Sequence, residues 1–204
     1  FAREHIAPKD GIEKSSFSEA TNCRGLEQYM HIFESLQEQA SHLLPNAHQE
    51  LGQLVGIDGS LIDGTLSMRW ADYRKGSKKA KVHVGFDLNR SIPRKVHLTH
   101  GNGAERPIVS QILFKGQTGV LDRGYQCHDL FDQWQNNDQL FICRIKASTK
   151  KKIISQNVVP ADSIVFFDAM VLLGTAGINQ SQQPLRLVGY EVDRVKYWIA
   201  TNRY

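Results

Sequence analysis

The chain has 204 residues, of which 41% are hydrophobic and 23% charged, a composition typical of globular proteins with a sizeable core. It contains no run of eighteen apolar residues, which excludes a helical membrane span, and its first residues lack the apolar run of a signal peptide. The net charge of +4 favours an anionic partner weakly, and three scattered cysteines argue against a disulfide framework and fit the cytoplasm.

The first fifty residues predict a helical N-terminal segment, residues 1–50. A short helix is expected to start near Ser16, and apolar residues at intervals of three and four predict an amphipathic helix over 25–44 that ends at Pro45. Because the chain begins at Phe1 rather than at a methionine, we expect it to be internal to a longer protein.

Residues 51–146 alternate between strand and helix patterns. Strands are expected at 54–58, 81–88, 94–99, 119–122 and 140–145, and helices at 105–115 and 125–136. The second and third strands should form an antiparallel hairpin. This order predicts an α/β fold, in which helices pack on a mixed sheet. Residues 147–204 predict a β-rich insertion that returns toward the core, with short strands at 164–167, 170–173, 185–192 and 195–200.

Two of the expected strands end in an aspartate. Residues 54–58 and 119–122 are short apolar runs that close on Asp58 and Asp122. A carboxylate in such a place is costly unless it is hydrogen-bonded or binds a metal, and functional groups gather at strand ends in open sheets. If the two strands are neighbours, the two acids converge and fit Mg²⁺ or Mn²⁺ chemistry on phosphates. The alternative is that each aspartate caps the turn that follows it.

Several segments resemble, in family order, the DDE transposases of the insertion-sequence-4 type. Ile57-Asp58-Gly59-Ser60 is similar to the family's first catalytic strand, and Lys81-Val82-His83 to the Lys-x-His segment of its second strand. Leu121-Asp122-Arg123-Gly124-Tyr125 is similar to the segment that carries the second aspartate. Residues 15–20 and 200–204 are similar to segments that flank this domain.

The resemblance implies a ribonuclease-H-like fold, in which a mixed sheet positions three acids around two Mg²⁺ or Mn²⁺ ions. Asp58 and Asp122 would be the first two acids. One ion would activate the attacking water or 3′-hydroxyl, and the other would stabilise the leaving oxygen. The substrate would be DNA, as transposon ends and target, cut and joined by in-line displacement. The working complex would be a homodimer in the bacterial cytoplasm, associated with the nucleoid when bound.

The sequence departs from the family at the third acid. The family signature Tyr-x2-Arg-x3-Glu-x6-Lys is not found in residues 123–204, and the Glu that follows Asp122 in the chain, Glu191, has the surroundings of a solvent-facing strand residue. We therefore expect a catalytic-domain fragment that is inactive alone. The alternatives are a truncated transposase remnant that binds DNA and cuts nothing, and an unrelated magnesium-dependent phosphohydrolase.

The basic residues are clustered rather than evenly spread. Six cations and one acid lie between Arg69 and Lys81, and five cations and no acid lie between Arg144 and Lys152. For each cluster the alternatives are a solvated loop and a DNA contact, and for residues beside Asp122 the alternative is packing against the sheet. The residues predicted to contact DNA are Arg74, Lys75, Lys78, Lys79, Lys81, His83, Arg123 and Tyr125.

Overall fold

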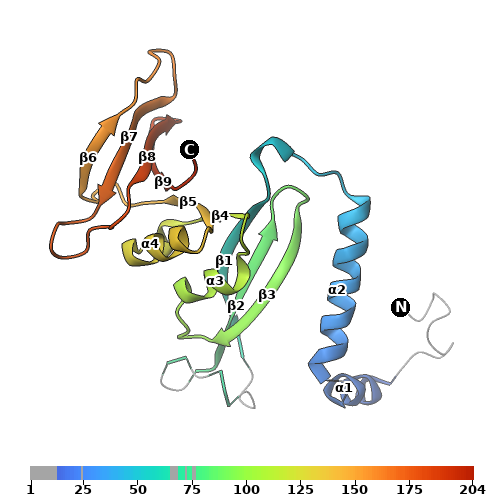
Figure 1. The fold of residues 1–204 in the computed structure, drawn as a ribbon. Helices are drawn as coiled ribbons and strands as arrows, with labels where there is room; N and C mark the ends of the chain where they lie inside the picture. The colour runs from blue at the N-terminus through green and yellow to red at the C-terminus, as the bar shows by residue number, and fades with distance from the viewer. Residues whose placement is uncertain (1–12, 24, 65–68, 72, 75–76) are drawn as a thin grey trace. The chain divides into compact units, whose positions relative to one another are not determined.

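The computed structural model describes residues 13–23, 25–64, 69–71, 73–74 and 77–204. The chain divides into two compact units, residues 1–44 and residues 45–204 (Figure 1). The first unit contains α1 (Lys14–Cys23) and α2 (Gly25–Leu43), in agreement with the expected helices. Over the described part of the chain, no helix is both long and apolar enough to cross a lipid bilayer.

The second unit is built on one mixed sheet. Its strands follow the order β3-β2-β1-β4-β5-β9-β8-β7-β6 across the described residues. Strands β1, β4 and β5 pair in parallel, and every other neighbouring pair is antiparallel. The strands are β1 (Leu54–Asp63), β2 (Lys79–Asp87), β3 (Ile92–His100), β4 (Thr118–Leu121), β5 (Leu140–Arg144), β6 (Lys151–Gln156), β7 (Val165–Leu173), β8 (Leu185–Val192) and β9 (Val195–Thr201).

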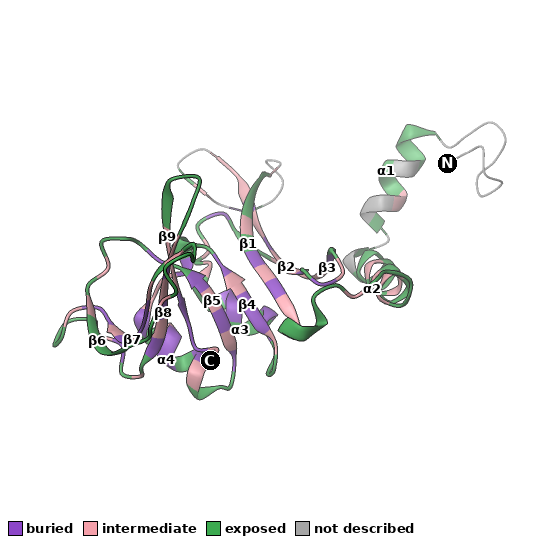
Figure 2. Cartoon of the chain, turned by 90° about the horizontal axis from the view of Figure 1, so that it is seen from above, coloured by how far each residue is buried: buried purple, intermediate pink, exposed green. Residues whose placement is uncertain are grey.

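Helices α3 (Val109–Ile112) and α4 (His128–Asn136) pack on this sheet. The connections also contain the 3-10 turns η1 (Gln49–Leu51), η2 (Arg106–Ile108) and η3 (Arg123–Tyr125). Ile112 of α3 and Phe131 and Trp134 of α4 pack with Ile57 and Leu121 of the sheet in the hydrophobic core. Figure 2 shows the buried residues concentrated in α3, α4 and the central strands. The expected α/β fold, a mixed sheet with flanking helices, is confirmed.

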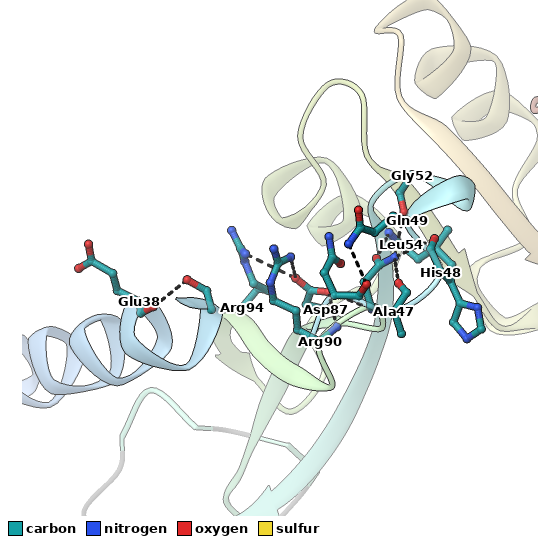
Figure 3. Close-up of polar contacts among 12 residues, drawn as sticks. Glu38, Ala47, His48, Gln49, Gly52, Leu54, Asp87, Arg90 and Arg94 are labelled. Atoms are coloured by element: carbon teal, nitrogen blue, oxygen red, sulfur yellow. Dashed lines mark hydrogen bonds and ion pairs between the residues drawn. The ribbon is translucent and has the colours of Figure 1, made fainter. Parts of the chain in front are cut away.

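Polar side chains fix the start of β1. Asn89, in the turn between β2 and β3, accepts a hydrogen bond from Leu54 N–H at 2.7 Å and donates to Ala47 and Gly52 carbonyls at 2.9 and 3.0 Å. The fully buried Asp87 accepts from the Asn89 and Arg90 backbone N–H groups (Figure 3 shows the surroundings of Asp87). The approach to β1 is therefore bound to the β2–β3 turn, which sets the strand's register.

Five elements differ from the sequence expectation. The strand expected at 54–58 continues to Asp63, because residues 58–63 stay paired with β2, so Asp58 lies within β1 rather than at its end. The helix expected over 105–115 ends at Ile112, because Leu113 is extended (φ −89°, ψ 124°). The helix expected from 125 starts at His128, after the η3 turn. The two strands expected at 164–167 and 170–173 are the single strand β7, and β6 was not expected at all. Strands β6 to β9, the expected β-rich insertion, extend the same sheet through the β5–β9 pairing.

Candidate active site

The structure places Asp58 and Asp122 on neighbouring strands. Strands β1 and β4 are parallel, and their last paired positions are Ile57 and Leu121. Asp58 follows Ile57 within β1, and Asp122 follows Leu121, the last residue of β4, so each aspartate comes one residue after this last pairing. This is the adjacency that the predicted metal site requires.

Both carboxylates point away from the helix-covered face. Ile57 and Leu121 are each only 4% exposed and belong to the core, whereas Asp58 and Asp122 are exposed. Because successive side chains in extended backbone alternate between faces, and Asp122 is still extended (φ −78°, ψ 166°), the two acids share the opposite face. The sheet thus presents two carboxylates together to solvent.

Each carboxylate is oriented by the backbone of the residue that follows it. Gly59 N–H donates to Asp58 Oδ1 at 2.8 Å, and Arg123 N–H donates to Asp122 Oδ1 at 2.5 Å. Asp122 is therefore the N-cap of η3. The capping role considered in the sequence analysis is real, and it leaves the carboxylate exposed for a second role.

The donor set fits a hard divalent cation only in part. Mg²⁺ in phosphate chemistry is commonly held by one or two carboxylates, with waters and substrate phosphate oxygens completing the octahedron. Asp58 and Asp122 supply two such carboxylates. Over the residues whose placement is described, no group of three or more His, Cys, Asp or Glu side chains is arranged to hold a metal.

Tyr125 lies beneath this pair rather than on the surface. It is 1% exposed and packs in the core, and its hydroxyl has no hydrogen-bond partner among the described residues. Burial raises the pKa of the Tyr125 phenol, and the negative charges of Glu105, Asp58 and Asp122 raise it further, in that order. The phenol is a core group close to three carboxylates, and its burial gives no support to direct DNA contact.

Lys81 and His83 are also turned inward. Lys81 Nζ donates to the Gly103 carbonyl at 2.9 Å and pairs with Glu105 Oε1 at 3.1 Å. His83 is fully buried, with Nε2 2.9 Å from Thr99 Oγ1, and burial lowers the pKa of its imidazole. The predicted DNA contacts at these two positions are not supported, because both side chains are largely buried and bonded to neighbouring residues.

The rest of the first basic cluster lies beyond the far end of β1. Lys79 pairs with Asp63 at 2.5 Å, and Asp63 is five residues past Asp58, roughly 16 Å along the strand. Arg74 is exposed and lies over the Tyr73 ring at 4.9 Å. Lys78 is half-buried and already interacts with another group of the protein. Lys75 lies outside the described residues.

Two basic hollows open beside Asp122 instead. The larger, of about 430 Å³, has four cations and no acid in its lining, and the smaller, of about 270 Å³, has three cations and one acid. Arg123 and Lys146 line both. The cations are Arg123, Arg144, Lys146 and Lys196 in the larger hollow, and Arg106, Arg123 and Lys146 in the smaller one.

Gln126 joins the turn after Asp122 to these hollows. Its Oε1 accepts from Lys146 N–H at 3.0 Å, and its Nε2 donates to Thr149 Oγ1 at 2.9 Å. Sequence reasoning predicted Arg123 but missed Arg106, Arg144, Lys146 and Lys196. The cation run from Arg144 to Lys152 was a signal for two of them, whereas Arg106 and Lys196 are brought in only by the fold.

Comparisons with known proteins show what the chain is similar to. Residues 51–201 match the family described as the transposase DDE domain. The chain is 30% identical over 83 residues to the "Probable transposase for insertion sequence element IS5377" of Geobacillus stearothermophilus, which covers 41% of this chain and 22% of that protein. It is 29% identical over 125 residues to the transposase y4zB of Sinorhizobium fredii, which covers 57% of this chain and 34% of that protein.

The chain therefore spans only about a fifth to a third of the length of these curated relatives. Among solved structures, a piggyBac transposase synaptic complex with hairpin DNA aligns at a TM-score of 0.45 and 16% identity. That alignment covers 74% of this chain and 33% of the other.

Proposed function

The chain belongs to the transposase DDE domain family, and we propose that it supplies two metal-binding aspartates and a DNA-holding surface to metal-dependent DNA cleavage and strand transfer. The observation that carries this proposal is the placement of Asp58 and Asp122 one residue past the last pairing of parallel neighbours β1 and β4. No single feature of composition or charge would support it alone.

Asp58 and Asp122 would hold Mg²⁺ or Mn²⁺ through their outward-facing oxygens. Such ions would generate the attacking nucleophile and stabilise the leaving oxygen of a phosphodiester. This chain would contribute by holding the two carboxylates in position. Each aspartate is fixed by a backbone N–H, and the buried strands beneath keep the two carboxylates side by side, so little reorganisation is needed when the cation and the DNA arrive.

The DNA backbone would lie across the two basic hollows. They adjoin Asp122 through Arg123, and the excess of cations in their linings attracts phosphates over a range set by salt. Arg144 is pre-positioned by the ring of Tyr197, with 5.1 Å between the guanidinium carbon and the ring centroid. A protein acting on chromosomal DNA would work in the bacterial cytoplasm, near the nucleoid, and bringing two transposon ends together would require at least a homodimer.

The metal role is tested by Mn²⁺ binding to the isolated chain, followed by electron paramagnetic resonance of the free ion. Asp58→Asn and Asp122→Asn should each abolish measurable binding, because the neutral amide removes the charge while preserving shape. Asp193→Asn, in the exposed β8–β9 turn, is the matched control and should bind as wild type. Equal binding by wild type and Asp58→Asn would refute the metal site.

The DNA role is tested by fluorescence anisotropy with short duplexes over a range of salt. Arg144→Ala and Lys196→Ala should weaken binding of any sequence and reduce the salt slope by about 1 each. Lys115→Ala removes an exposed lysine that pairs with Asp138 outside the hollows, and should leave both quantities unchanged. A salt-independent affinity would contradict contact between the DNA backbone and these hollows.

The alternative, DNA binding without cleavage, is supported by the position of Glu191. This residue is exposed on β8, pairs with Lys196 and lies beside the hairpin turn, so it does not join Asp58 and Asp122 as a third acid. We propose that the isolated chain binds metal weakly and does not complete strand transfer. Magnesium-dependent nicking of DNA by the isolated chain, lost in Asp58→Ala, would overturn that statement.

A further inference from the structure

The backbone pairing that brings the two aspartates together stops just before them. Strand β4 ends at Leu121, and the chain then turns into η3, whereas β1 continues to Asp63 paired with β2. No β1–β4 ladder position lies beyond Ile57 and Leu121 in the described structure. The strand pairing brings the two aspartates together, and contacts from other elements are needed to hold the segments beyond it.

We propose that Glu105 and Arg106 are positioning residues that bind the two aspartate-bearing segments to each other. The inference rests on the proposed metal site, because its purpose is to fix the distance between Asp58 and Asp122. The two residues are consecutive, one holding the Asp58 segment and the other the Asp122 turn. They start η2, whose Ile108 is buried in the core together with Val109 of α3, so the pair has a rigid base.

Glu105 holds the Asp58 side. Its side chain lies directly over Gly59, where an added Cβ would be 3.3 Å from Glu105 Cγ, Cδ and Oε1. Because residue 59 is a glycine and has no side chain, the Glu105 carboxylate can lie close to β1. Lys81 keeps it there, through the 3.1 Å ion pair to Glu105 and the 2.9 Å hydrogen bond to the Gly103 carbonyl. Lys81 is itself fixed by β2, where it pairs with Leu61 of β1.

Arg106 holds the Asp122 side. Its Nε donates to the Gly124 carbonyl at 3.1 Å, two residues after Asp122 in the η3 turn. This turn is the one whose Arg123 N–H orients the Asp122 carboxylate. Lys81, Glu105 and Arg106 therefore connect β2, β1 and η3 into one support.

The experiment compares Mn²⁺ affinity and amide hydrogen exchange in four variants. Glu105→Gln and Lys81→Met remove the ion pair, Arg106→Leu removes the bond to Gly124, and Lys81→Arg preserves the pair. Glu105→Gln, Lys81→Met and Arg106→Leu should each weaken Mn²⁺ binding by about tenfold, which is the smallest effect usually seen when a residue that supports a metal ligand is lost. Lys81→Arg should bind within about twofold of wild type, a rescue that loss of general packing would not give. Matched controls, Glu191→Gln and Arg194→Leu, are exposed near the β8–β9 turn and should have no effect.

Hydrogen exchange separates this proposal from the metal site itself. In Arg106→Leu the Arg123 amide, which donates to Asp122, should exchange about tenfold faster without any metal present, while the melting temperature stays within a few degrees of wild type. Unchanged exchange in Arg106→Leu overturns the positioning role, whether or not wild type binds Mn²⁺. If exchange accelerates but Asp58→Asn binds Mn²⁺ as wild type does, the bridge stands and the proposed metal site fails.

Discussion

At the scale of single residues, two buried aspartates differ from Asp58 and Asp122 in how their oxygens are engaged. The buried ones are saturated: Asp132 accepts from Gln182 N–H and Gln183 N–H, and Asp168 accepts two hydrogen bonds from Arg186. Asp58 and Asp122 are exposed, and each has one oxygen engaged by the following backbone N–H. A carboxylate that serves stability is paired, because unpaired burial is costly, whereas one that serves binding stays open.

Asp168 gives a prediction with a defined pH dependence. Hydrogen bonding to Arg186 lowers the pKa of the Asp168 carboxyl, so its stabilising effect is full above the unfolded pKa, about 3.9, and is lost as pH falls through the lowered folded pKa. Because Arg186 is 38% exposed, solvent screening limits the effect, and Asp168→Asn should lower the free energy of unfolding at pH 7 by about 1 kcal/mol.

The measurement is urea unfolding of wild type and Asp168→Asn at pH 7 and at several values below pH 4. The difference between the two proteins should shrink toward zero as the wild-type carboxyl is protonated. Asp162→Asn, at an exposed loop position, is the control and should show little difference at either pH. A difference that stays constant with pH would mean that the loss comes from packing and not from charge.

At the scale of elements, the sequence predicted those strands whose apolar pattern is uninterrupted. The apolar runs that close on Asp58 and Asp122 and strand β8 were found because their apolar residues are buried, and the β2–β3 hairpin was found from the alternation of its apolar residues. Strand β7 was predicted as two pieces because the polar Asp168 interrupts its apolar pattern. In the fold, Arg186 on β8 donates two hydrogen bonds to Asp168 and offsets the cost of burying this carboxylate. Strand β6 was missed because Lys151 and Lys152 look like a solvated turn, although lysines are common on edge strands.

The candidate site divides in the same way. Asp122 and Arg123 were predictable because they follow the end of an apolar strand, and Asp58 because the apolar run 54–57 closes on it, although β1 itself continues to Asp63. Lys196 lies on β9, and the pairing of β9 with β5 brings it to the larger hollow. A pairing between strands so far apart in the chain cannot be recognised from the local sequence. Lys81 and His83 were predicted as DNA contacts from a family resemblance. Such a resemblance identifies the residues but does not say which face of the sheet their side chains occupy. The alternation of side chains across β2 puts them on the inner face.

The packing of α3 on β2 gives a prediction at this scale. A Cβ on Gly85 would lie 2.3 Å from Ile112 Cγ2, too close for either to remain in place. Gly85→Ala should therefore lower the free energy of unfolding by about 1–3 kcal/mol, the usual cost of overpacking. Denaturant unfolding measures the loss, and the double variant Gly85→Ala with Ile112→Ala should recover part of it. Gly124→Ala, where an added Cβ meets nothing within 4 Å, is the matched control. Equal stability of Gly85→Ala and wild type would show that α3 shifts freely.

At the scale of the whole molecule, the division into two units makes the second a domain in its own right. All the buried hydrophobic residues of the core, from Val55 to Ala200, belong to residues 45–204, whereas Tyr29, Ile32 and Leu36 of α2 are 47%, 55% and 60% exposed. A unit of this size buries most of the surface it needs for stability. The sheet, both aspartates, both hollows and the Glu105–Arg106 bridge lie in it.

We therefore expect residues 45–204 to fold without residues 1–44. The isolated unit should unfold in a single cooperative transition, with a melting temperature within about 5 °C of the full chain, because the interactions lost stabilise α1 and α2 rather than the core. Circular dichroism during heating tests this, and the Mn²⁺ affinity of the unit should match that of the full chain. A non-cooperative transition, or a large loss of affinity, would show that residues 1–44 complete the domain, since the sheet and its site would then depend on contacts from outside their own core.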